Sequence, residues 1–147
     1  MRIFFDTNVL VSAHTARGLS ADLMRLVLGE HEFLTGEVNL EEFRGVLEHR
    51  FRVPATAIAQ IERDLRAEAI IPRPTAPSAL PRTDPADRWV LASAVAGGAD
   101  ILVTGDRHLL EVASEAPLEI LSPRACWERL RGSDEGSGVG ERPLTRP

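Results

Sequence analysis

The fold is decided by residues 3–10, which read IFFDTNVL. Their first three residues form a continuous apolar run, which is typical of a central parallel strand that is buried on both faces. Asp6 ends this run and stands where a helix can begin, so that its carboxylate can cap the first backbone amides. We therefore predict a buried first strand that leads directly into a helix.

The rest of the chain continues this alternation of short apolar runs with helical periodicity. Four prolines between residues 72 and 81 exclude both helix and strand and predict a connecting loop. This pattern predicts the α/β class, with helices on both faces of a parallel sheet. Further strands are predicted at 31–34, 101–104 and 118–121, and further helices at 19–27, 38–47, 58–65, from 84 to two glycines at 97–98, at 109–113 and at 124–130.

Length and composition predict a single domain. The 147 residues are 44% hydrophobic, and no apolar run approaches the length that spans a bilayer. The first residues lack the features of a secretory signal, so we expect a cytoplasmic protein with no membrane contact. We place the domain at residues 1–131. Residues 132–147 are rich in glycine, proline, serine and charge, and they are predicted to be a disordered tail.

Charge and residue usage restrict the chemistry. A net charge of −5 argues against broad electrostatic binding of nucleic acid, so such a substrate would need bound cations. Cys126 is the only cysteine, and the four histidines are scattered without the spacing of a metal site. All 17 basic residues are arginines. A metal, if present, would therefore be held by oxygen ligands.

Three aspartates are predicted at one edge of the sheet. Asp6 and Asp106 directly follow predicted strands, and Asp87 lies in the first turn of a helix that leads into one of those strands. Each alone is explained by helix capping or by the helix dipole. Together they would surround the crevice beyond the carboxyl ends of the strands, where ligands bind in open parallel sheets.

Glu42 is the fourth candidate. Val38 lies one helical turn before it and Val46 one turn after it, which predicts that Glu42 belongs to the apolar, core-facing side of its helix. A core-facing carboxylate requires a partner, either an arginine or a metal ion. Converging carboxylates without histidine or cysteine suit Mg²⁺ or Mn²⁺.

Four segments of the chain carry a family resemblance: FDTNVLVSA (5–13), LEEFRGVL (40–47), DPADRWVLA (84–92) and LVTGDRHLL (102–110). In this order they resemble the motifs of PIN domains, the family that includes VapC-type toxins. The resemblance extends from residue 1 to about residue 127 and selects Asp6, Glu42, Asp87 and Asp106 as the metal-binding catalytic acids. Its departures are Gly36, where relatives often carry serine, and loops with arginine in place of lysine.

The resemblance implies a three-layer α/β/α fold, one or two Mg²⁺ or Mn²⁺ ions and hydrolysis of single-stranded RNA. The ions would activate a water and stabilise charge on the phosphodiester. It also implies the toxin component of a type II toxin–antitoxin system, a small antitoxin as partner and a possible homodimer. An RNA-processing PIN nuclease without a toxin role would carry the same residues.

Other residues are candidates for supporting roles. Asn8 and Thr104 are expected either to orient the acids or to cap helices, and Asp84 is expected beside Asp87. Arg88 and Arg107 are candidates to contact flanking phosphates, since a guanidinium can bind phosphate through two hydrogen bonds.

Two other classes of protein share part of this pattern. A Mg²⁺-dependent phosphoacceptor or phosphatase-like domain also places aspartates at strand ends, but such sites normally use a lysine, which this chain lacks. An inactive PIN fold that serves as a binding module is the second rival, and the presence of all four acids gives it no support.

Overall fold

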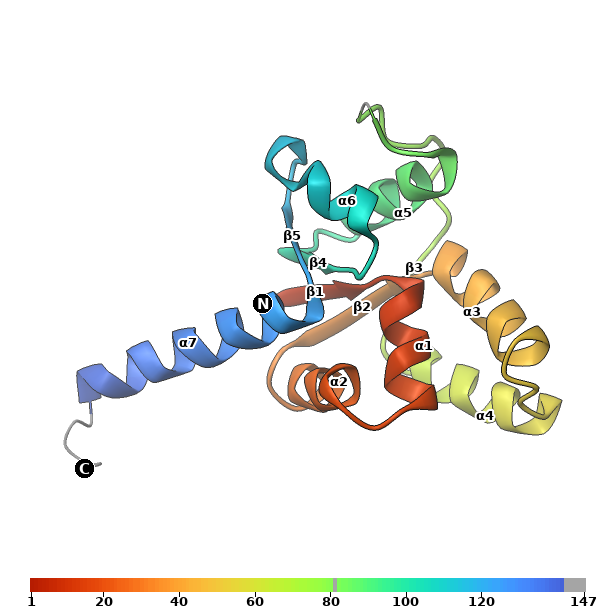
Figure 1. Ribbon diagram of the computed structural model, residues 1–147, viewed down its shortest axis with the longest axis horizontal. Helices are drawn as coiled ribbons and strands as arrows, with labels where there is room; N and C mark the ends of the chain where they lie inside the picture. The colour runs from red at the N-terminus through yellow and green to blue at the C-terminus, as the bar shows by residue number, and fades with distance from the viewer. Residues whose placement is uncertain (81, 142–147) are drawn as a thin grey trace.

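The computed structural model describes residues 1–80 and 82–141 and contains one five-stranded parallel sheet (Figure 1). β1 occupies the centre, and Ile3 lies between Phe33 of β2 and Ile101 of β4. This arrangement confirms the predicted α/β class and the buried first strand. In spatial order the strands are β3 (Ala69–Ile71), β2 (Glu32–Gly36), β1 (Arg2–Phe5), β4 (Ile101–Val103) and β5 (Glu119–Leu121).

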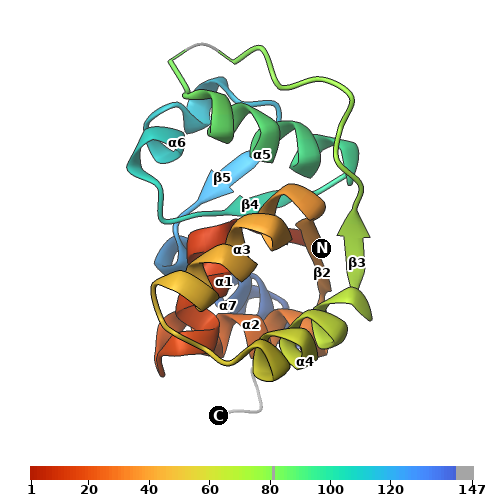
Figure 2. The same cartoon turned by 90° about the vertical axis from the view of Figure 1, so that its right-hand side faces the viewer.

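Helices cover both faces of the sheet, which gives three layers (Figures 1 and 2). Successive side chains of a strand point to opposite faces. Ile3 and Phe5 therefore join one core, and Phe4 joins the other. The first face packs against α1 (Thr7–Thr15), α2 (Leu19–Glu30), α3 (Glu37–His49), α4 (Ala55–Arg66) and α7 (Pro123–Glu141), and the second against α5 (Pro85–Ala96), α6 (Arg107–Glu111) and the short 3₁₀ helix η1 (Ala113–Glu115).

Four elements differ from the sequence prediction. β3 and η1 were not predicted, and α6 begins two residues earlier than expected because Asp106 caps it directly. α7 continues to Glu141, through part of the segment that was expected to be a disordered tail, whereas residues 142–147 lie outside the described residues. The boundary of the domain at residue 131 stays a prediction.

No helix in the described part of the chain is both long and apolar enough to cross a membrane.

The topology brings the ends of β1 and β4 together. These strands are hydrogen-bonded neighbours, with Phe5 opposite Val103, so the residues that follow them emerge side by side. The backbone N–H of Asp6 donates to the carbonyl of Val103 across this junction, at 3.0 Å. The two aspartate-bearing turns after β1 and β4 are thereby fixed to each other.

Candidate active site

Asp6 lies in a buried hydrogen-bond network at the end of β1. Asp6 is 6% exposed. Its Oδ1 accepts hydrogen bonds from the Thr7 backbone N–H at 2.8 Å and from Asn39 Nδ2 at 3.1 Å. Its Oδ2 accepts from the Thr104 hydroxyl at 2.7 Å and, more weakly, from Asn8 Nδ2 at 3.3 Å. Burial raises the pKa of Asp6 to about 6, although the hydrogen bonds from Thr104 and Thr7 oppose that rise.

Asn8 and Thr104 also connect Asp6 to the turn after β4. Asn8 Oδ1 accepts from the Gly105 backbone N–H at 2.8 Å. The Thr104 hydroxyl oxygen accepts from the Asp106 backbone N–H at 3.0 Å while its proton goes to Asp6. Both residues therefore contact Asp6 and hold the turn after β4, whereas the helix caps here are Asp6 and Asp106 themselves.

Asp87 is held by the start of α5. Asp84 is the N-cap and accepts from the Asp87 backbone N–H at 2.9 Å, and Pro85 occupies the first turn. Asp87 is 6% exposed, and its buried Oδ2 has no hydrogen-bond partner among the described residues. Burial, a hydrogen bond with Asp106 and the negative charges around it raise the pKa of Asp87 to about 7.

Asp106 caps α6 at the neighbouring strand end. Its Oδ1 accepts from the His108 backbone N–H at 2.8 Å, and its side chain is about one quarter exposed. Its negative charge is one of the causes that raise the pKa values of Asp6 and Asp87. The three aspartates therefore act on one another electrostatically, as expected for acids around a shared crevice.

The predicted environment of Glu42 was wrong. The buried side of α3 carries Leu40, Phe43 and Leu47, and Glu42 is exposed rather than core-facing. Among the described side chains no arginine forms an ion pair with it, so the alternative of a buried Arg–Glu pair is also wrong. Glu42 instead faces a pocket, where its charge contributes to the raised pKa of Asp6.

One pocket of about 530 Å³ brings these acids together. Most of its remaining lining comes from α1 and from the end of α3. Thr104 lies beneath the pocket, fully buried against Asp6. The predicted acids and supporting residues that line it are Asp6, Asn8, Glu42, Asp84, Asp87 and Asp106.

Residues 2–108 match the family model described as "PIN domain". This match covers well over half of the chain and includes all four acids. The chain belongs to the PIN-domain family. PIN domains are generally nucleases, and the resemblance noted in the sequence is thereby confirmed at the level of the family.

A solved structure shows the same fold. A chain of the crystal structure of VapBC2 from Rickettsia felis, bound to a DNA fragment from their promoter, superposes with a TM-score of 0.56. The two sequences are 15% identical, and the alignment covers 83% of this chain and 98% of the other. No curated protein sequence gives a significant match.

The acids of this PIN domain have the chemistry that a divalent cation requires. They offer only hard oxygen donors, the buried Oδ2 of Asp87 has no partner among the described residues, and a cation would relieve the repulsion that contributes to two raised pKa values. The described side chains nevertheless contain no group of three or more that is already arranged as a metal-ligand set.

Neither predicted phosphate-binding arginine lines the pocket of this PIN domain. Arg88 is half-buried, and its Nε donates to the Thr83 hydroxyl at 3.3 Å. Arg107 is exposed on α6 and also lies outside the lining. Arg50, at the end of α3, is the arginine that does line the pocket.

The sequence reasoning missed three residues of the site. Asn39 is buried and donates to both Asp6 Oδ1 and Thr7 Oγ1, and Arg50 and Phe51 line the pocket. Asn39 could have been found from the apolar side of α3, because Asn39 precedes Phe43 by one turn. Arg50 and Phe51 follow the predicted helix, and no periodicity identifies them.

Proposed function

We propose that this PIN domain is an endoribonuclease that hydrolyses phosphodiester bonds of single-stranded RNA with Mg²⁺ or Mn²⁺. The observation that carries the proposal is the shared pocket of Asp6, Glu42, Asp87 and Asp106, with two raised pKa values and one unpartnered buried carboxylate oxygen. These four acids are the proposed metal ligands and catalytic residues. When bound, the cation would neutralise charge on the phosphodiester and make the attacking water easier to deprotonate.

The protein contributes by orienting the acids. Asn39, Thr104 and Asn8 donate to Asp6 and thereby fix both of its oxygens. Asp84 holds the backbone of Asp87, whose buried Oδ2 has no hydrogen-bond partner among the described residues. Such fixed carboxylates require little rearrangement as charge develops during in-line attack on phosphorus.

A toxin role is proposed as the biological setting. The fold resembles a chain from a VapBC complex, and this likeness supports a small antitoxin as the partner of this domain. A homodimer and a cytoplasmic location belong to the same proposal. An RNA-processing nuclease without a toxin role is the alternative, and it uses the same acids.

The decisive experiment compares wild type with Asp6→Asn and Asp87→Asn on labelled single-stranded RNA. We expect cleavage by wild type with Mn²⁺ or Mg²⁺, none with EDTA, and a loss of at least about 100-fold in both variants, because each removes an anionic ligand. Exposed Glu111→Gln is the matched control and should cut like wild type. Metal-independent cleavage, or full activity of both variants, would refute the proposal.

The toxin role has its own test. Induced expression of wild type should arrest bacterial growth, whereas expression of Asp6→Asn should not. Normal growth with an active enzyme would favour the RNA-processing alternative.

A further inference from the structure

The active-site pocket continues as a groove between α1 and α3. Asn8, Ser12 and Thr15 line it from α1, and Glu42, Val46 and Arg50 line it from α3. Both sets are spaced by three or four residues, so each follows one side of its helix. The two helices pack against each other (Figure 2). A span of eight residues is about 12 Å along a helix, so the groove extends well beyond the acids.

The far end of this groove has a different chemistry from the acidic end. Arg50 is the only cationic side chain among the described residues that line the pocket, and no described acid forms an ion pair with it. Phe51 lies beside it with 43% of its surface exposed, and the Arg50 guanidinium carbon lies 5.9 Å from the centre of the Phe51 ring. A single exposed phenylalanine is ordinary, but an exposed ring beside an unpaired guanidinium in the active-site groove is a specific combination.

The connection between α3 and α4 holds this pair in place. The Phe51 backbone N–H donates to the Val46 carbonyl, and the Val53 backbone N–H donates to the Leu47 carbonyl at 2.9 Å. Arg52 takes a left-handed conformation with φ of 54°, which turns the chain after Phe51, and Val53 then packs on the core. The ring is thus presented by an ordered turn.

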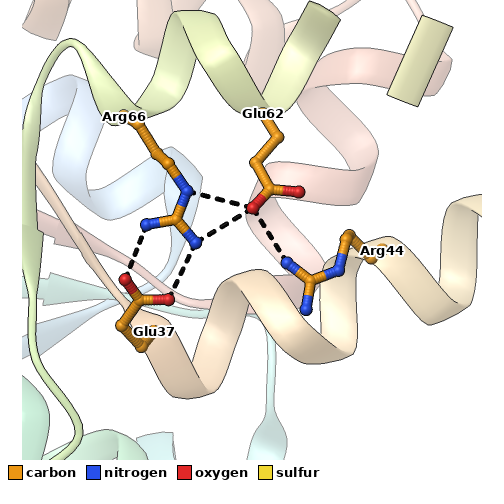
Figure 3. A network of polar contacts seen from close by, with 4 residues as sticks. All are labelled: Glu37, Arg44, Glu62 and Arg66. Carbon is orange, nitrogen blue, oxygen red and sulfur yellow. Dashed lines mark hydrogen bonds and ion pairs between the residues drawn. The ribbon is translucent and has the colours of Figure 1, made fainter. Parts of the chain in front are cut away.

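An ion-pair network fixes the two helices on either side of that turn (Figure 3). Arg66 of α4 donates to both carboxylate oxygens of Glu37 on α3, at 2.6 and 2.9 Å. Glu62 of α4 accepts from Arg44 of α3 at 2.9 Å and also from Arg66. Because the network spans α3 and α4, it restricts the movement of the Arg50–Phe51 turn relative to Glu42.

We propose that Arg50 and Phe51 form a subsite for one unpaired nucleotide of the RNA, farther along the groove from the scissile bond. The base stacks on the Phe51 ring and its phosphate contacts the Arg50 guanidinium. Stacking needs an exposed aromatic face and is tolerant of base identity, and a guanidinium suits a phosphate. The five carboxylates of the pocket repel the negatively charged RNA backbone, and Arg50 provides a local attraction that opposes this repulsion. The inference rests on the proposed function and adds the residues that hold the substrate.

The test measures binding of a fluorescent single-stranded RNA in EDTA, where cleavage is absent, and then KM and kcat with Mn²⁺. Phe51→Leu keeps apolar bulk and removes the ring, so we expect binding about tenfold weaker and a raised KM, whereas Phe51→Trp should restore both. Arg50→Ala should weaken binding. The slope of log K against log salt concentration should become shallower by about one, which corresponds to the loss of one phosphate contact. Leu28→Ala and Arg25→Ala, on exposed positions of α2, are the matched controls.

The outcomes separate this inference from the nuclease proposal. If wild type cuts RNA but Phe51→Leu and Arg50→Ala behave like the α2 controls, the subsite is wrong and the nuclease stands. If wild type binds RNA without cutting it and both variants lose binding, the subsite stands and the proposed reaction fails. If folded wild type neither binds nor cuts RNA, both are overturned.

Discussion

Gly36 is a residue whose small size is imposed by a neighbour across the fold. A Cβ added there would lie 2.3 Å from Ser93 Oγ and 3.1 Å from Asn39 Oδ1. Ser93 Oγ therefore occupies space that a side chain at position 36 would need, which gives a physical reason for the glycine. Asn39 is also the residue that donates to Asp6, so crowding here reaches the active site.

We predict that Gly36→Ala lowers the free energy of unfolding by about 1–3 kcal/mol through overpacking. Ser93→Ala should change it little, because Ser93 Oγ is buried without a hydrogen-bond partner among the described residues. The double variant should recover most of the loss, since the shortest contact is gone. Urea unfolding of the three variants measures this coupling, and a double variant as unstable as Gly36→Ala alone would show that Ser93 is not the obstacle.

Glu42 shows how far a sequence determines a single residue. The order of the motifs selected it correctly for the pocket, but its environment was mispredicted because α3 has two candidate apolar sides. One is marked by Val38 and Val46, and the other by Leu40, Phe43 and Leu47, which the structure buries. Which side faces the core depends on how α3 packs on α1 and α4, and the local periodicity of α3 does not show that packing.

At the scale of elements, the sequence predicted the strands and helices that have strong local patterns. β3 was missed because it has three residues at the edge of the sheet, between α4 and the proline-rich segment, and so lacks a recognisable period. α7 was predicted too short because its later residues are poor helix formers. The Arg50–Phe51 turn was missed for a related reason, since its importance comes only from where α3 ends in space.

The network between α3 and α4 gives the prediction at this scale. Arg66→Ala removes the bonds to Glu37 and Glu62, and we expect a loss of about 0.5–1 kcal/mol in the free energy of unfolding, because the pairs are partly exposed. High salt should reduce this loss. Arg63→Ala, on the same helix and bonded only to Gln60 among the described side chains, is the control and should cost less. Equal losses in both variants at every salt concentration would show that the network does not contribute to stability.

The whole molecule combines a negative net charge with an acidic pocket that includes two buried carboxylates, those of Asp6 and Asp87. The sequence predicted acids at one edge of the sheet from their places directly after strands or in the first turn of a helix, because parallel strands place their carboxyl ends at one edge. It did not predict which acids are buried and unpartnered, since that depends on contacts between β1, α3 and β4. Those contacts make the pocket costly for the metal-free fold.

The cost should appear as a pH-dependent stability. Burial raises the pKa of Asp87 from its ordinary 3.8 to about 7, so the unfolded chain releases this proton at lower pH than the folded one. The contribution of Asp87 is then fully favourable below about pH 4 and is lost as pH rises through 7. Asp6 acts in the same direction, because its pKa is raised to about 6. Paired acids such as Glu37, whose pKa Arg66 lowers, change the stability in the opposite direction as pH rises. Their contribution has to be separated from that of Asp87 and Asp6.

We therefore predict that, without metal, Asp87→Asn is about as stable as wild type at pH 4 and about 2 kcal/mol more stable at pH 8, since each pKa unit corresponds to about 1.4 kcal/mol and solvent screens part of it. Wild type and Asp87→Asn contain the same paired acids, so the contribution of those acids cancels when the two stabilities are compared. The variant Glu111→Gln, at an exposed position, should show no such pH-dependent gain. Mn²⁺ should stabilise wild type at pH 8 and the variant much less, because it binds the charged pocket only when folded. Urea unfolding at both pH values measures these effects. A variant that is less stable than wild type at pH 8 without metal would mean that Asp87 supports the fold and that its charge is not held for a cation.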